Sequence, residues 1–127
     1  MEELKAYYLK VVINNFANFD GRAGRKEFWY FTLINIVVFG ILSILSALSD
    51  FLFFLYPLYG LAVLIPSLAV TTRRLHDTNR SAWYIILAFV PFVNLYILYL
   101  MLLKGDKGEN KYGPEPDESM PQNTAII

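Results

Sequence analysis

The sequence predicts an all-α integral membrane protein with three apolar helices and an N-terminal interfacial amphipathic helix. Hydrophobic residues make up 56% of the 127 residues, whereas soluble domains contain roughly 45–50%. Three apolar runs cover residues 28–48, 51–70 and 82–103, and none contains a Lys, Arg, Asp, Glu or His. A helix needs about 20 residues to cross a hydrocarbon core of ~30 Å, and each run is long enough. Buried helices of a soluble bundle are the alternative, but they would show a polar face that these runs lack.

Residues 1–19 predict the interfacial amphipathic helix. Seven apolar side chains follow helical spacing: Leu4, Tyr7, Tyr8, Val11, Val12, Phe16 and Phe19. Such a helix lies in the plane of the lipid head groups, although Lys5 and Asn15 interrupt its apolar face and a frayed terminus remains the alternative. Glu2 and Glu3 argue against a cleaved signal peptide, which begins with a basic segment.

The basic residues predict how the first two spans are oriented. Lys5, Lys10, Arg22, Arg25 and Lys26 precede the first run, and Arg73, Arg74 and Arg80 follow the second. The turn between these runs, residues 49–50, contains neither Lys nor Arg. Because short basic segments stay on the cytoplasmic side, we expect a multi-pass protein with a cytoplasmic N-terminus.

The third run, 82–103, allows two structures because Pro91 and Asn94 lie near its middle. A kinked span would place the C-terminal tail on the outer side. A re-entrant turn near Pro91 would place all 11 basic residues on one side, but its backbone would have to be shielded from lipid. We favour the kinked span, which needs less shielding. In the membrane domain, 20–116, a structured turn is expected at 104–116, and the tail 117–127 has the composition of disorder.

Aromatic pairs follow a cation at two places and predict interfacial anchors. Trp29 and Tyr30 follow Lys26, and Trp83 and Tyr84 follow Arg80. Amphipathic rings of this kind settle at the membrane–water interface while the cation reaches the head groups.

A strip of small residues on the first span predicts helix packing. Gly40, Ser43 and Ala47 recur at helical spacing, and small residues let two helix backbones approach closely in a membrane. The expected partner is a second copy of the chain or another membrane protein.

Charged residues gather between the second and third runs, in "TTRRLHDTNRSAWY". We predict that this cluster and the basic residues before the first run bind lipid head groups, in particular anionic ones, or a partner protein, because arginine forks match phosphate. The candidate residues are Arg22, Arg25, Arg73, Arg74, His76, Asp77 and Arg80. The chain has no cysteine and one histidine, so no metal site, cofactor or thiol nucleophile is expected. The net charge of zero gives no indication of nucleic-acid binding.

The charged cluster is also compatible with different roles. It could be the polar hinge that any two spans need, or the chain could be a helix-packing assembly factor. It could also be an enzyme or transporter subunit acting on a phosphorylated lipid, with His76 as the acid–base and Asp77 orienting it. On a helix these two neighbours would point about 100° apart and would not form a dyad. The sequence therefore favours a non-catalytic protein and indicates no catalytic residue.

Three motifs, "FDGRAGRKEFW", "RRLHDTNRSAW" and "KGENKYGPEP", stand in this order around the apolar runs. Together they resemble the bacterial family of small inner-membrane proteins catalogued as domain of unknown function 805, over roughly residues 5 to 117. The family pattern has glycine where Ala82 and Asn94 stand here. The resemblance implies the bacterial inner membrane and no mechanism beyond what the residues themselves indicate.

Overall fold

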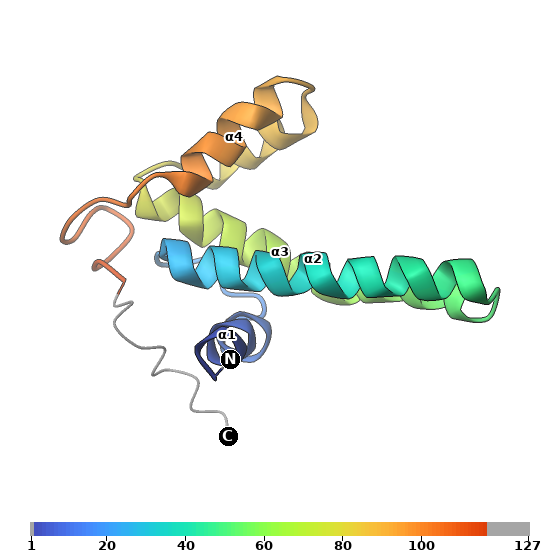
Figure 1. Cartoon of the computed structure of the whole chain (residues 1–127). Helices are drawn as coiled ribbons and strands as arrows, with labels where there is room; N and C mark the ends of the chain where they lie inside the picture. Colours follow the sequence, from blue (N-terminus) through green and yellow to red (C-terminus); the bar gives the residue numbers. More distant parts are fainter. Residues whose placement is uncertain (1, 117–127) are drawn as a thin grey trace.

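A computed structural model describes residues 2–116, and helices account for most of this range (Figure 1). The elements are α1 (Glu2–Leu9), the π-helical turn η1 (Lys10–Asn14), α2 (Arg25–Leu48), the 3₁₀ turn η2 (Leu52–Phe54), α3 (Leu55–Asp77), the 3₁₀ helix η3 (Ala82–Phe89) and α4 (Val93–Leu102). The described residues form no strand beyond an isolated bridge between Asn110 and Gly113. The tail predicted to be disordered, 117–127, lies outside the described residues.

Helices α2 and α3 form a long antiparallel pair that dominates the molecule (Figure 1). Arg25–Leu48 and Leu52–Asp77 are both long and apolar enough to cross a membrane, with mean hydropathies of 2.4 and 1.9 in their most apolar windows. Only 11% of the residues in the first window are buried. A core helix of a soluble protein would bury its apolar surface, so the exposed surface of the pair is suited to lipid. The predicted all-α membrane class is confirmed, with two helices of spanning length.

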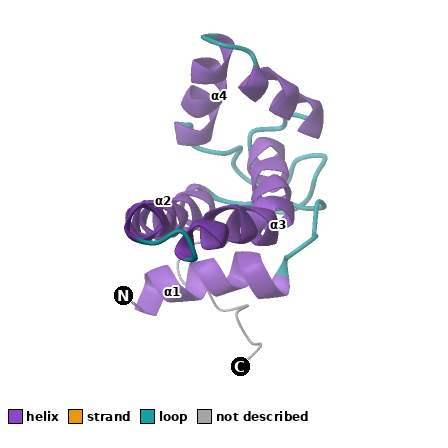
Figure 2. Cartoon of the chain, turned by 90° about the vertical axis from the view of Figure 1, so that its right-hand side faces the viewer, coloured by secondary structure: helices purple, strands orange, loops and turns teal. Residues whose placement is uncertain are grey.

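Helix α1 lies across this pair, as Figures 1 and 2 show together. Tyr7 and Val11 are completely buried, and the Tyr8 ring stacks on Phe31 of α2. The Tyr8 hydroxyl is 2.7 Å from the Tyr59 hydroxyl, which donates to Asn35 at 2.6 Å. The helical segment ends at Asn14, before the predicted boundary at 19. Its location in the head-group plane stays a prediction.

The third apolar run is a helical hairpin, so our preference for a continuous kinked span is wrong. Helix η3 ends at Phe89, the chain turns at 90–92, and α4 returns alongside η3 (Figure 1). Phe92, the N-cap of α4, has a positive φ of 70°, which is uncommon for residues other than glycine. Both arms pack on Leu75 of α3, with Ile97, Leu100 and Met101 buried in the same cluster. The structure therefore has the turn that the second alternative requires, and the position of this hairpin in a membrane stays a prediction.

Helix α3 continues seven residues past the apolar run, so residues 71–77 of the charged segment between the second and third runs are helical. It ends in a Schellman motif, in which the Arg80 amide donates to Leu75 and the Asn79 amide donates to His76. Asn79 has a φ of 61°, and asparagine tolerates this left-handed position better than most residues. The charged motif is therefore a rigid helical turn, and its side chains have fixed directions.

Candidate functional site

The three sequence motifs meet where α2 begins and α3 ends, which we call the basic end. The Ala23 amide donates to the Arg73 carbonyl at 2.9 Å, which ties the first motif to α3. The Asp106 amide donates to the Asp77 carbonyl at 2.8 Å, and the Asn110 side chain donates to the His76 carbonyl at 3.0 Å. The last turn of α3 thus joins segments that lie up to 55 residues before it and more than 30 after it.

Asp77 is the centre of this site because its carboxylate pairs with two buried arginines. Arg22 Nη2 lies 2.9 Å from Oδ1, and Arg74 Nη1 lies 3.0 Å from Oδ2. Both arginine side chains are fully buried, and that of Asp77 is 5% exposed. A buried charge is tolerated when it is paired and hydrogen-bonded, so the three groups depend on one another.

The two arginines also hold the chain that follows α4. Arg22 donates to the carbonyls of Gly108 and Asp106, at 2.5 Å each, and to that of Gly113 at 3.2 Å. Arg74 donates to the carbonyls of Met101, at 3.1 Å, and Leu103. The two guanidinium groups therefore hold the 104–116 segment and the C-terminal end of α4 against the end of α3.

Gly105 makes close contact with the Asp77 carboxylate. A Cβ added at this position would lie 2.0 Å from Oδ2 and 2.3 Å from Cγ of Asp77. Real Cβ atoms do not come this close to another heavy atom. Glycine at 105 is therefore required for the chain that leads into the third motif to pass over Asp77.

A second ion cluster ties α1 to the spans. Arg73 Nη1 lies 2.5 Å from Glu27 Oε2, and Lys10 Nζ lies 3.4 Å from Oε1 of the same carboxylate. Arg73 Nε also donates to the Asn18 carbonyl at 3.0 Å. Glu27 and Arg73 are 2% and 3% exposed, so this pair is as deeply buried as the first.

His76 and Asp77 have different partners, as expected for neighbours on a helix. The His76 ring stacks on Tyr112, with centroids 3.8 Å apart and planes 2° apart, and its Nδ1 is 2.9 Å from the Gly21 carbonyl. His76 is 8% exposed. These contacts pin the glycine turn at 21 and the 110–113 turn to α3. Among residues 2–116, no group of three His, Asp or Glu side chains could hold a metal ion.

The remaining predicted residues lie around this core. Arg25 is exposed and makes a long contact, 3.4 Å, with the Leu102 carbonyl, and Arg80 donates to the Thr78 carbonyl at 3.1 Å.

Trp29, one of the predicted anchors, donates to the Met101 carbonyl at 2.9 Å, so it ties α2 to the hairpin. The other anchors and the small-residue strip are placed as follows: Tyr30 donates to Glu3, Trp83 is 76% exposed, Tyr84 packs on the Leu75 cluster, and Gly40, Ser43 and Ala47 lie exposed on α2. Lipid binding, anchoring and helix packing by these residues stay predictions.

Sequence reasoning missed Glu27, Lys104 and Gly105 as site residues. Glu27 stands one residue before the first apolar run, and Gly105 stands between Lys104 and Asp106. A single carboxylate at the start of a span is ordinarily explained by the helix dipole, so its partner Arg73 could not be inferred from the sequence.

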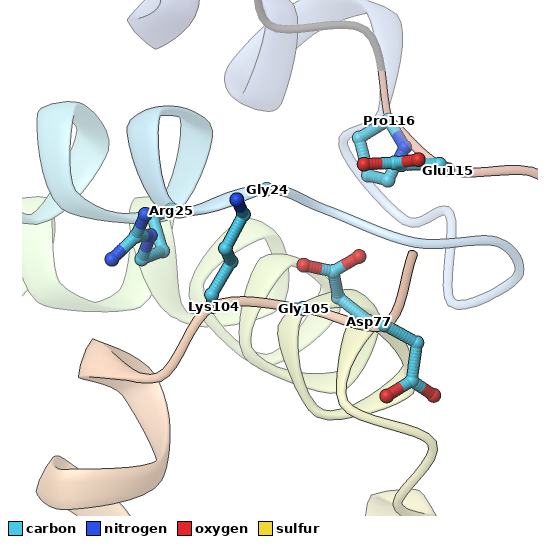
Figure 3. A pocket seen from close by; sticks show the side chains of 8 residues that line it. Gly24, Arg25, Asp77, Lys104, Gly105, Glu115 and Pro116 are labelled. Carbon is cyan, nitrogen blue, oxygen red and sulfur yellow. The ribbon is translucent and has the colours of Figure 1, made fainter. Parts of the chain in front are cut away.

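A small open pocket lies beside Asp77 at the basic end (Figure 3). Its volume is about 80 Å³, and its lining includes Gly24, Arg25, Asp77, Lys104, Asp106 and Glu115. The Lys104 side chain extends toward Gly24 at the start of α2, with Arg25 next to it (Figure 3). One water needs roughly 10–15 Å³, so the pocket has room for a polar group of several atoms.

The contacts at the basic end have a topological consequence. Residues 21–27, 73–80 and 105–113 are joined by direct hydrogen bonds and ion pairs. They must therefore lie on the same side of any membrane that α2 and α3 cross. The end of the 82–103 hairpin is bonded to the same region, through the Met101 carbonyl.

The apolar pair and its interlocked basic end define a small helical membrane protein. Residues 16–114 match the family described as "Protein of unknown function (DUF805)", and the chain belongs to this family. It is 41% identical to "Inner membrane protein YhaH" of Escherichia coli (strain K12) over 116 residues, which cover 87% of this chain and 95% of the relative.

Two further relatives come from the same strain. "Inner membrane protein YhaI" is 44% identical over 112 residues, covering 87% of this chain and 94% of the relative. "Uncharacterized protein YiiR" is 33% identical over 127 residues, covering 80% and 87%. No solved structure matches the chain. The family and the apolar helices identify an inner-membrane protein.

Proposed function

We propose that this protein is a non-catalytic inner-membrane protein whose basic end faces the cytoplasm and binds the phosphate of lipid head groups. The observation that carries the proposal is the division of its cations. Arg22, Arg73 and Arg74 are buried and used inside the protein, whereas Arg25 and Lys104 are exposed beside an open pocket. Head-group binding therefore belongs to the exposed pair and not to the buried arginines.

The cytoplasmic orientation follows from the positive-inside rule applied to the folded chain. All 11 Lys and Arg residues belong to the segments at the basic end, and the 49–50 turn at the opposite end has none. Cytoplasmic loops carry the excess of Lys and Arg. The basic end is accordingly cytoplasmic, and α2 and α3 cross the membrane.

The hairpin dimensions fit insertion into one leaflet. Eight residues of η3 extend about 16 Å at 2.0 Å each, and ten residues of α4 extend about 15 Å at 1.5 Å each. Each arm thus reaches about half of the ~30 Å hydrocarbon thickness. Trp83, Phe89 and Phe92 are all more than 75% exposed, which places apolar rings where lipid chains would surround them.

Single cysteines test this topology, because the chain has no cysteine of its own. We expect Asp50→Cys to react with a membrane-impermeant maleimide in intact cells, because it lies at the outer turn. Asn79→Cys and Lys111→Cys should react only after the membrane is permeabilised. Labelling of position 111 in intact cells would show that residues 82–103 cross the membrane, and labelling of position 79 would reverse the orientation.

Arg25 and Lys104 lie where lipid phosphates are found. Arg25 is the first residue of α2, three positions before the apolar run, and Lys104 follows the end of α4 by two residues. Gly24, the N-cap of α2, has no side chain to cap the helix, and free amides at a helix N-terminus favour an anion. Two cations and a helix N-terminus therefore converge on one position.

Removing the two cations should release lipid. For the double variant Arg25→Gln with Lys104→Gln, we expect phospholipid retention to fall about thirtyfold. Each cation contributes ~1 kcal/mol to lipid binding, and the loss of both corresponds to this factor. Native mass spectrometry of protein released from nanodiscs measures the retained lipid. The matched control is Lys107→Gln with Lys111→Gln, which removes the same charge from exposed positions. Equal retention in wild type and the pocket variant would refute the proposal, as would an equal loss in the control.

A further inference from the structure

We propose that the pocket beside Asp77 selects a zwitterionic phospholipid head group, one that carries a primary ammonium as well as a phosphate. This inference rests on the proposed head-group binding and names its ligand class. Arg25 and Lys104 supply two positive charges to the lining, and Asp106 and Glu115 supply two negative charges. The lining therefore matches a ligand with charges of both signs and no net charge.

Asp77 also lines the pocket, but its charge is already compensated. Both of its oxygens pair with the buried Arg22 and Arg74, at 2.9 and 3.0 Å. A ligand entering the pocket consequently meets Asp77 as a carboxylate that is already paired with two arginines. The carboxylates that remain to attract an ammonium are those of Asp106 and Glu115.

The charges of opposite sign are separated within the pocket. Arg25 and Lys104 lie on the side of the α2 N-terminus, and Glu115 lies across from them (Figure 3). One oxygen of Glu115 accepts the Gly108 amide at 2.9 Å, and one oxygen of Asp106 accepts the Asn110 side chain at 3.2 Å. These bonds orient the carboxylates beside the pocket, so the ligand's phosphate and ammonium have separate places.

The position of the pocket favours a lipid over a soluble compound. The two cations adjoin the ends of α2 and α4, and the surfaces of both helices carry exposed apolar side chains such as Leu33, Leu98 and Leu102. Acyl chains of a bound lipid would lie along these surfaces. The carboxylates of Asp106 and Glu115 stand on the loop that follows α4 and line the same pocket.

The test is a competition in nanodiscs that contain equal amounts of phosphatidylethanolamine and phosphatidylglycerol, read by mass spectrometry of the retained lipid. We expect phosphatidylethanolamine to be enriched on the wild-type protein. Glu115→Gln should reduce this enrichment about threefold, a change in the range of an exposed ion pair, while total retained lipid stays the same. The control is Glu109→Gln, an exposed glutamate outside the pocket lining, which should keep the enrichment.

The outcomes separate this inference from the proposed function. Equal retention of the two lipids, a preference for phosphatidylglycerol, or an unchanged enrichment in the Glu115 variant overturns the zwitterion assignment. The proposed function fails independently if the Arg25 and Lys104 double variant retains as much total lipid as wild type. Soluble phosphoethanolamine forms a second arm and should not displace the lipid; displacement would assign the pocket to a soluble ligand.

Discussion

Replacing Asp77 by asparagine is expected to lower the free energy of unfolding by about 3–5 kcal/mol, the loss usual when one partner of a buried ion pair is removed. Asparagine keeps the size of the side chain but leaves the fully buried Arg22 and Arg74 without their counter-charge. Thermal unfolding in detergent, followed by circular dichroism, measures the change. Asp20→Asn is the matched control because Asp20 is exposed close to the same site, and it should change stability by less than about 0.5 kcal/mol.

A double variant separates loss of charge from loss of packing. Arg22→Leu should also destabilise the protein, because the arginine holds three carbonyls of the 106–113 segment. If charge pairing dominates, Arg22→Leu combined with Asp77→Asn should lose clearly less than the sum of the single losses, since each variant removes the same pair. Additive losses, or an Asp77→Asn variant as stable as the control, would contradict the role assigned to the carboxylate.

Replacing Gly105 by alanine is expected to cost about 2 kcal/mol or more, within or above the range for forcing an extra methyl into a packed site. The added Cβ would lie 2.0 Å from Asp77 Oδ2, and that carboxylate cannot move away without breaking its pair with Arg74. The third motif should then separate from α3. Increased reactivity of a cysteine at Asn110, together with a lower melting temperature, would report this separation.

Gly40→Ala is the control for this glycine substitution. No atom lies within 4 Å of a Cβ at Gly40, and alanine is favoured over glycine in a helix by about 0.8–1.0 kcal/mol. Within one chain the substitution should therefore be neutral or stabilising. If Gly40 packs closely on a second copy, as the small-residue strip predicts, Gly40→Ala should lower the oligomeric mass instead. Equal destabilisation by the two substitutions would argue against a specific contact at Gly105.

The sequence predicted the apolar helices well because their signal is local. An uninterrupted run of about 20 apolar residues has few stable conformations other than a helix in lipid. The predicted run 28–48 corresponds to α2, Arg25–Leu48. The run 51–70 stops seven residues short of the end of α3, because hydropathy marks the apolar part of a helix and not the polar turns that continue it.

The local sequence could not distinguish the hairpin from the kinked span, because Pro91 and Asn94 indicate a break in either structure. The choice depends on Arg74 and Trp29, both of which donate to the Met101 carbonyl and so bring the end of α4 back to the start of the run. These bonds cross 27 and 72 residues of sequence.

The amino-acid sequence by itself determined the helical membrane class, the family, and the end of the molecule at which its charges gather. Only the tertiary structure decided what those charges bind. An arginine next to an apolar run has the same local sequence whether it meets a lipid phosphate or a carboxylate elsewhere in the chain. Arg22 finds its carboxylate 55 residues away, at Asp77. Burial then strongly favours that pairing, because an unpaired charge removed from water is strongly destabilising.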